Sequence, residues 1–477
     1  MSPRKAFEYL NRIAGIAPLT PPAFEGADPV LVTPFRAAEA ASAALGMSAA
    51  IAAEIWRLRG GDKQTISLDV RAAAASLLSY SYVRRDGQAL PRPSADAPTV
   101  GLYRCGDGRW IQLHGGFPRQ WPRTLDLLNA AHTRESVAQA CAKWNAFALE
   151  DAIAFMGLSG AVVRGREEWA ETAQGRALAA RPPVVLKKIA EAPPLRLGEA
   201  AEPLSNVRVL DLTRVLAGPA CGRTLASYGA EVLNLRAERL DTIELFDLDT
   251  GHGKRCAYLD LIKPADAEQL RQLARDAHIF VDSYRPGALA KLGFTPAALA
   301  HICRGITYVS VACYGNEGPW SGRRGWEQVA QAATGLALEQ GQFTAARRGR
   351  EREAAPELIP AAVLDYTTGY LAAAGAAAAL LRRIREGGSW HVQVSLSATA
   401  MWLQSLGKVE PGLVPAQADL SGLDAYLRSC DTAQGRLDFL GPVIKMSKTA
   451  PVWQCPPPLP GADRAQWQNA REEMHAA

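Results

Sequence analysis

The 477-residue sequence contains no CxxC pair, no block of basic residues and no signal-peptide core, and each absence excludes a class of protein. Its eight cysteines and seven histidines show no metal-ligand spacing. We therefore expect reduced thiols in a cytoplasmic protein, and no metal site. Lys and Arg number 53 against 48 Asp and Glu. This small excess argues against nucleic acid as the main partner, while single cations remain available to hold a phosphorylated ligand.

A membrane partner is not expected either. Residues 1–15, MSPRKAFEYLNRIAG, lack the apolar core of a signal peptide. The alanine-rich stretch at 371–381 is too short, and its side chains are too small, to span a bilayer. These features favour a cytoplasmic location.

Two phosphate-binding motifs are missing as well. The Gly-His-Gly-Lys of residues 251–254 lacks the first glycine and the Ser or Thr of a Walker A loop, and no GxGxxG follows the first strand-like segment after residue 206. A tight turn before a strand explains residues 251–254 equally well. The segment 315–336 also allows two interpretations, a loop with a capped helix or an anion-binding loop at a helix N-terminus.

What is present is a regular alternation over residues 206–400. Short apolar segments such as VRVLDL, EVLNLR and ITYVSV alternate with amphipathic helical segments. This pattern predicts an α/β fold with a Rossmann-like parallel sheet and helices on both faces. Because ligands bind such sheets beyond the carboxyl ends of the strands, one site should be lined by the turns at 214–219, 236–239, 283–287 and 313–320.

An internal repeat accompanies this pattern. The stretch IAAEIWRLRGGDKQTISLDVRAAA (51–74) resembles AAALLRRIREGGSWHVQVSLSATA (377–400). The shared Gly-rich turn and the shared strand end favour duplication over a chance likeness of two alanine-rich units. Before the helix the copies differ, since Asp365 stands in the second copy where the first has Pro34, Phe35 and Arg36. We therefore expect only the second copy to carry this carboxylate.

Asp365 itself allows two interpretations. It lies between an apolar segment and about four turns of alanine and leucine. Asp is among the best residues for accepting the free amide hydrogens at a helix start, so a capping role is the plain interpretation. The alternative is a carboxylate that takes part in chemistry.

Five blocks of the sequence, in order, resemble the signature blocks of the family III CoA-transferases. They are VRVLDLTRVLAGPACGRTLASYGAEVL, HGKRCAYLDL, VDSYRPGALAKLGF, GITYVSVACYGNEGPWSGRRGWEQVAQAATGL and LDYTTGYLAAAGAAAALLRR. This family includes formyl-CoA transferase and L-carnitine CoA-transferase, and the α-methylacyl-CoA racemases are similar to it. Residues 51–195 resemble the rest of that fold, with its smaller α+β domain and its closing segment. A second copy of the closing segment is recognisable at 441–461.

The resemblance implies a truncated tandem duplication in three parts. Residues 1–195 would be a partial copy with a helix–strand unit, a small domain and a closing segment. Residues 196–400 would be the Rossmann-like domain that binds CoA and carries the catalytic residue, and residues 401–477 the C-terminal closing segment. The first copy lacks the nucleotide-binding half and the second lacks a small domain, so we expect the two to complete one catalytic unit. A homodimer is possible.

The resemblance also implies the chemistry. The carboxylate at the position of Asp365 attacks an acyl-CoA thioester, and CoA passes through an aspartyl anhydride and an aspartyl-CoA thioester to a carboxylic acid acceptor. Coenzyme A enters as the acyl-CoA substrate. The helix N-terminus is expected to keep Asp365 ionised. The positions that match the family's CoA contacts are Ala217, Leu259, Ser283, Tyr284, Arg285, Lys291, Leu292 and Arg324.

Three departures from the family pattern limit these expectations. Arg236 stands where the family usually has Glu, so a phosphate contact is expected to move to Arg236 or Arg239. Trp326 replaces a His that the racemases need, which makes α-proton exchange improbable. Leu216 replaces the Gln of formyl-CoA transferase, so oxalate and formate are not supported as substrates. The alternatives are an inactive acyl-CoA-binding protein, a racemase or isomerase, and a nicotinamide-dependent oxidoreductase, the last disfavoured by the missing glycine motif.

Overall fold

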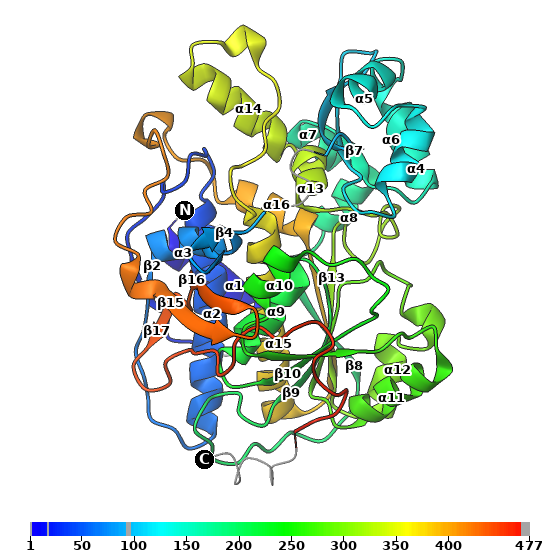
Figure 1. Ribbon diagram of the computed structural model, residues 1–477. Coiled ribbons are helices and arrows are strands. Elements are labelled where there is room, and N and C mark those ends of the chain that lie inside the picture. Colours follow the sequence, from blue (N-terminus) through cyan, green and yellow to red (C-terminus); the bar gives the residue numbers. More distant parts are fainter. Residues whose placement is uncertain (1, 17–18, 92–96, 469–477) are drawn as a thin grey trace.

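The computed structural model describes residues 2–16, 19–91 and 97–468, and its centre is a seven-stranded sheet (Figure 1). Six neighbouring strands are parallel and the seventh, β8, is antiparallel at one edge. This confirms the predicted Rossmann-like sheet. In spatial order the strands are β11 (Lys254–Tyr258), β10 (Glu231–Arg236), β9 (Arg208–Leu212), β12 (Ile279–Asp282), β13 (Thr307–Ala312), β14 (Ser389–Ser395) and β8 (Val184–Ala190).

Alternate side chains of the central strands enter two separate cores. In β9, Val209 packs in one core, whereas Leu210 and Leu212 pack in the other. Because both faces of these strands are buried, their sequences are nearly continuous apolar runs, as a parallel sheet requires. The first core contains α2 (Ala37–Leu58), α9 (Ala217–Ala226) and α15 (Val363–Glu386), and the second contains α11 (Pro264–Arg275) and α12 (Pro296–Ile302).

The two long helices α2 and α15 pack against each other in the first core. In the described part of the chain, α2 is the one helix long and apolar enough to cross a membrane, and 89% of its most apolar stretch is buried inside the structure. Gly369 lets α15 approach the start of α9 closely, because a Cβ at this position would lie 2.5 Å from the Ala217 carbonyl oxygen. This approach brings Asp365 near the turn between β9 and α9.

A smaller sheet has the same strand order and strand directions as one edge of the large sheet. It consists of β1 (Ala23–Glu25), β2 (Ile66–Asp69) and β17 (Ile444–Met446), with β1 parallel and β17 antiparallel to β2. The order matches β13, β14 and β8 in the large sheet, and β2 and β14 are the strands of the sequence repeat. The closing strand of the first copy, β8, thus completes the sheet of the second copy, and β17 completes the sheet of the first.

A small α+β domain follows the first copy's strand, as predicted. Its sheet contains β5 (Val100–Arg104), β6 (Trp110–His114) and β7 (Gly160–Val162), covered by α4 (Trp121–Leu128), α5 (Arg134–Cys141) and α6 (Ala146–Phe155). A fourth sheet pairs two strands of the C-terminal segment with two of the first copy, in the order β15 (Leu427–Thr432), β16 (Gly435–Leu440), β3 (Arg84–Arg85) and β4 (Gln88–Ala89). The other helices are α1 (Pro3–Ala14), α3 (Val70–Ser76), α7 (Arg166–Glu171), α8 (Ala173–Ala179), α10 (Glu244–Thr250), α13 (Glu327–Thr334), α14 (Leu336–Arg347) and α16 (Leu396–Ser405).

This exchange of strands predicts that the second copy depends on the first. Residues 200–477 expressed alone should aggregate or be inactive, because β14 loses its partner β8 and the buried face of α15 loses α2. Solubility and size-exclusion chromatography would measure this, with co-expressed residues 1–199 as the control that restores a soluble complex. A soluble, active fragment would contradict the prediction.

Candidate active site

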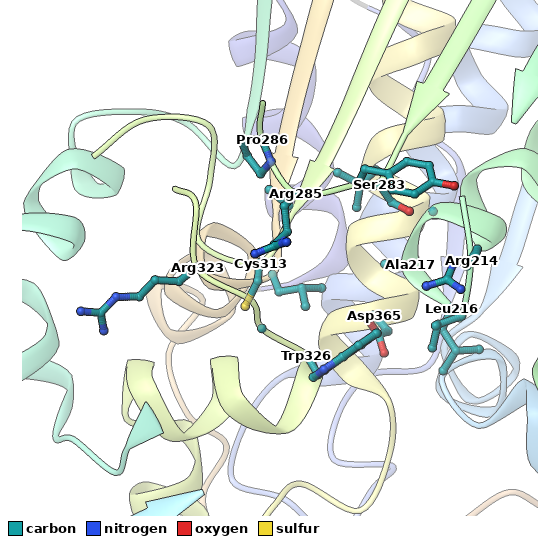
Figure 2. A pocket seen from close by; sticks show the side chains of 17 residues that line it. Arg214, Leu216, Ala217, Ser283, Arg285, Pro286, Cys313, Arg323, Trp326 and Asp365 are labelled. Atoms are coloured by element: carbon teal, nitrogen blue, oxygen red, sulfur yellow. The ribbon is translucent and has the colours of Figure 1, made fainter. Parts of the chain in front are cut away.

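A cavity lies at the carboxyl ends of the central strands (Figure 2). Three of the four predicted turns line it, through residues 214–218, 283–286 and Cys313. The turn at 236–239 does not contribute to its lining. The remaining contributions come from the end of β13, the loop before α13, the first turn of α15 and the first residue of α16.

The structure brings five of the nine predicted site residues together in this cavity. These are Ala217, Ser283, Tyr284, Arg285 and Asp365. Their assembly from β9, β12 and α15 follows from the parallel sheet, whose strand ends meet at one edge.

The other four predicted residues lie outside the lining of the cavity. Leu259 is buried in the second core. Lys291 and Leu292 lie in the short 3-10 helix η2 (Ala290–Leu292). Arg324 Nε donates a hydrogen bond to the Gly157 carbonyl oxygen at 2.7 Å, and its neighbour Arg323 lines the cavity instead.

Arg214 and Arg285 bring positive charge to the lining of the cavity. Arg214, which sequence analysis did not single out, donates to the Asp241 carbonyl oxygen at 2.9 Å, and burial lowers the pKa of its guanidinium. Within the described ranges Arg285 forms no ion pair, so its guanidinium is available to an anion. Arg323 borders the cavity, but its guanidinium points away from it (Figure 2), toward Asp151 at 3.4 Å.

The two arginines expected to replace a family phosphate contact are paired elsewhere. Arg236 Nη1 lies 2.8 Å from Asp247 Oδ2, and Arg239 Nε lies 2.8 Å from Asp260 Oδ2. Neither lines the cavity. Arg214 and Arg285 are therefore the better candidates for binding phosphate groups.

Val215 holds a strained backbone conformation in the turn between β9 and α9. Its φ is +73°, in the left-handed region that a β-branched side chain rarely adopts. Such strain persists only where the surrounding structure imposes it, and it is concentrated at functional sites. No pattern in the sequence distinguishes Val215.

Asp365 does not cap its own helix, so the capping interpretation is wrong. α15 begins at Val363, and the acceptor at its N-terminus is the carboxylate of Glu327 from α13. The backbone amides of Leu364 and Asp365 donate to this carboxylate at 3.0 and 2.6 Å. The carboxylate of Asp365 lines the cavity instead (Figure 2).

The expectation that the helix N-terminus keeps Asp365 ionised is also wrong. Burial raises the pKa of Asp365 well above its usual range, and the charge of Glu327 raises it further. Burial also raises the pKa of Glu327, to about 7. We assign the negative charge of this pair to Glu327, because it accepts hydrogen bonds from two backbone amides and from Gln331 Nε2 at 2.8 Å.

Cys313 is a second potential nucleophile in the lining of the cavity, which also contains the hydroxyl groups of Ser283 and Tyr284. Burial and the neighbouring Asp365 raise the pKa of its thiol well above the usual value. The thiol therefore stays protonated near neutral pH, and a protonated thiol is a poor nucleophile.

Trp326 joins the first copy to the site. Its ring stacks on Phe117 with a centroid distance of 4.8 Å and on His114 at 5.4 Å, and both partners belong to the small-domain segment. The position that carries an acid–base group in the racemases thus holds an aromatic contact between the two copies.

A second cavity, of about 400 Å³, lies beyond Asp365. It shares four lining residues with the first cavity: Val215, Leu216, Trp326 and Asp365. Asp365 therefore lies where the two cavities meet.

The first copy retains a counterpart of the Glu327–Asp365 pair, contrary to expectation. Glu39 occupies the third position of α2, as Asp365 does in α15, and its backbone amide donates to Asp28 Oδ2 at 2.8 Å. Burial raises the pKa of Asp28 to about 7. Glu39 is itself buried and ion-paired with Arg36 at 3.2 Å, and it lines neither cavity.

Comparison with known proteins identifies the family. The model of CoA-transferase family III matches residues 10–200 and again residues 204–413. The chain belongs to this family. The two matches agree with the duplication inferred from the repeat, and family membership makes coenzyme A thioesters the expected substrates.

Named relatives cover different shares of the chain. An acyl-CoA transferase of Gibberella moniliformis is 31% identical over 79% of this chain and 72% of its own length. A probable fatty acyl-CoA transferase of Mycobacterium tuberculosis is 31% identical over 43% of this chain and 53% of its own. Human succinyl-CoA:glutarate CoA-transferase is 28% identical over 41% of this chain and 45% of its own length. The chain thus spans about half the length of the last two relatives. A crystal structure of the mycobacterial protein is 30% identical, with a TM-score of 0.39 over 43% of this chain and 58% of that one.

Replacement of Arg285 tests the anion-binding assignment. Arg285→Ala should weaken CoA binding by about 1–3 kcal/mol, the range for a charge-assisted hydrogen bond. The melting temperature without ligand should hardly change, because Arg285 is exposed. Arg239→Ala is the matched control, since Arg239 is paired with Asp260 outside the cavity. Calorimetry in which both variants bind CoA like the wild type would rule out the assignment.

Proposed function

We propose that the protein transfers CoA from an acyl-CoA thioester to a carboxylic acid, with Asp365 as the nucleophile. The observation that carries this proposal is the position of the Asp365 carboxylate, which lies at the junction of an arginine-bearing cavity and a second cavity. Glu327 performs the helix capping, so the side chain of Asp365 is not needed for it. The thiol end of CoA would reach Asp365 by way of the first cavity, with its phosphates near Arg214 and Arg285, and the acyl group would enter the second.

The first half of the proposed reaction removes CoA from the donor. An oxygen of the Asp365 carboxylate attacks the thioester carbonyl carbon, the C–S bond breaks, and CoA leaves as the thiolate with a mixed anhydride on Asp365. The thiolate then attacks the Asp365 carbonyl carbon of this anhydride. The donor acid leaves as a carboxylate, and CoA is held on Asp365 as a thioester.

The second half reverses these steps with the acceptor. The acceptor carboxylate attacks the aspartyl-CoA carbonyl carbon and expels the CoA thiolate, which gives a second mixed anhydride. The thiolate attacks the acyl carbonyl carbon of that anhydride, so the new acyl-CoA forms and Asp365 returns as a carboxylate. No proton is gained or lost over the cycle.

Backbone amides at the start of α9 are suited to stabilise the oxyanions of these steps. Ala217 and Gly218 line the first cavity at the first two positions of α9, and no side chain caps this helix end. Free amide hydrogens at a helix N-terminus attract developing negative charge.

Replacement of Asp365 separates this chemistry from a structural role. Asp365→Asn should fold and bind CoA but transfer nothing, because an amide cannot attack a thioester as a carboxylate does. Incubation of the wild type with acyl-CoA, trapping with hydroxylamine or borohydride and peptide mass analysis should place an adduct on Asp365. Glu39→Gln, at the same helix position in the first copy, is the matched control and should keep transfer. Normal transfer by the Asn variant, or an adduct on a different carboxylate, would refute the proposal.

The Glu327 charge should set the pH dependence of transfer. Asp365 attacks only when ionised, and its pKa is raised, so kcat/KM should fall with decreasing pH well above the ordinary Asp value of about 4. Burial is the main cause of the raised pKa and the charge of Glu327 adds to it, so Glu327→Gln should move this acidic limb part of the way to lower pH. It should also lower the free energy of unfolding by about 1–2 kcal/mol through loss of the cap.

A matched variant exists for this experiment too. Asp28→Asn weakens the equivalent cap of α2, and it should leave the pH profile of kcat/KM where it is in the wild type. The pH dependence of kcat/KM and urea unfolding of all three proteins are the measurements. An unmoved acidic limb in Glu327→Gln would mean that Glu327 does not control the ionisation of Asp365.

The inactive-protein alternative predicts no adduct in the wild type. An inactive acyl-CoA-binding protein would retain CoA affinity without covalent labelling of Asp365. The racemase alternative is disfavoured by Trp326, whose indole ring carries no group that exchanges protons near neutral pH.

A further inference from the structure

The second cavity is lined mainly by apolar side chains. Those on its walls beyond Asp365 include Leu78, Ile243, Leu245, Phe246, Leu358 and Ile359. Its volume of about 400 Å³ is in the range of cavities that hold small organic ligands. A substrate group that extends from Asp365 into the second cavity therefore contacts mainly apolar side chains.

The side chains that line the second cavity are either acidic or uncharged near neutral pH. No Lys or Arg is among the described residues that line it. Burial lowers the pKa of His114, its one histidine, to about 4, so this ring is neutral near pH 7. The acidic residues of the lining are Glu327 and Asp365, close to the reacting centre. A second carboxylate on a substrate would be buried here without a cation, which is strongly unfavourable.

Both copies build the walls. Leu78, Tyr80, Val100, His114 and Phe117 come from the first copy, and the stack of Phe117 on Trp326 closes one side next to Asp365. The remaining apolar walls come from the segments around α10 and before α15. The first copy therefore supplies part of the surface that an acyl group would contact, whereas the arginines facing the first cavity come from the second copy.

We infer that this second cavity holds the apolar chain of a monocarboxylic acid and of its CoA thioester, and that dicarboxylic acids are poor substrates. The inference rests on the proposed function for the position of the thioester at Asp365. Relatives named for succinate, glutarate or oxalate act on small acids with two carboxyl groups. The apolar lining of the second cavity, which contains no Lys or Arg among its described residues, offers no partner for the second carboxylate of such acids.

Identity exchange tests the inference without knowledge of the natural donor. Butanoyl-, hexanoyl- and octanoyl-CoA would each be incubated with the isotopically labelled matching acid, and succinyl-, adipoyl- and suberoyl-CoA with theirs. In the monocarboxylic series kcat/KM for label incorporation should rise with chain length, by up to roughly fourfold per added methylene. Each dicarboxylic acid should exchange more slowly than the monocarboxylic acid of the same length.

A pair of variants tests the cavity itself. Ile243→Arg places a cation in the lining, and it should slow exchange of octanoate and speed exchange of suberate. Thr242→Arg adds the same charge on the adjacent, exposed residue outside the lining, and should exchange both acids like the wild type. Faster exchange of the dicarboxylic acids by the wild type, or identical behaviour of the two variants, would overturn the inference.

A binding measurement separates failure of this inference from failure of the proposed function. Calorimetry with the Asp365→Asn variant should show affinity for acyl-CoA that increases from butanoyl- to octanoyl-CoA. If no acid is exchanged but this increase is found, the proposed transfer fails and the apolar cavity stands. If exchange occurs and neither the affinity nor the rate depends on chain length, the inference fails and the transfer stands.

Discussion

The hydrogen bonds from the first turn of α15 to the Glu327 carboxylate organise the site. By accepting the amides of Leu364 and Asp365, Glu327 fixes the start of the helix and leaves the side chain of Asp365 to face the cavities. Burial raises the pKa of Asp365, and the same Glu327 charge raises it further. One interaction thus determines the orientation of the proposed nucleophile and opposes its ionisation. A carboxylate of raised pKa is a stronger nucleophile once ionised, while a smaller fraction of it is ionised near neutral pH.

The reciprocal exchange of closing strands explains how two incomplete copies form one site. β8 completes the large sheet and β17 the small one, so each copy's sheet depends on a segment of the other. The first copy retains the carboxylate pair Asp28 and Glu39 at the start of α2, but Arg36 neutralises Glu39 in a part-buried ion pair. There the pair serves the helix start, and the first copy contributes to the site through its small domain and the segment around Tyr80.

Division of the site between the copies also bears on specificity. Cationic side chains gather in the cavity beside β9 and β12, and apolar side chains gather in the cavity on the other side of Asp365. A CoA thioester has the same division, since its nucleotide end is anionic and the acyl group proposed here is apolar. Changes in the first copy could therefore alter acyl preference while CoA binding, which the second copy would provide, stays intact.

The sequence alone determined the sheet, the family and the choice of Asp365, because these depend on local periodicity and on contiguous blocks of residues. It also indicated Ala217, Ser283, Tyr284 and Arg285, which follow strand ends and so converge in any parallel sheet. Only the tertiary structure decided what caps α15, since Glu327 lies 38 residues before the amide of Asp365 that it binds. The raised pKa of Asp365, the strand exchange and the apolar cavity likewise arise from residues far apart in the chain, whose proximity no local pattern encodes.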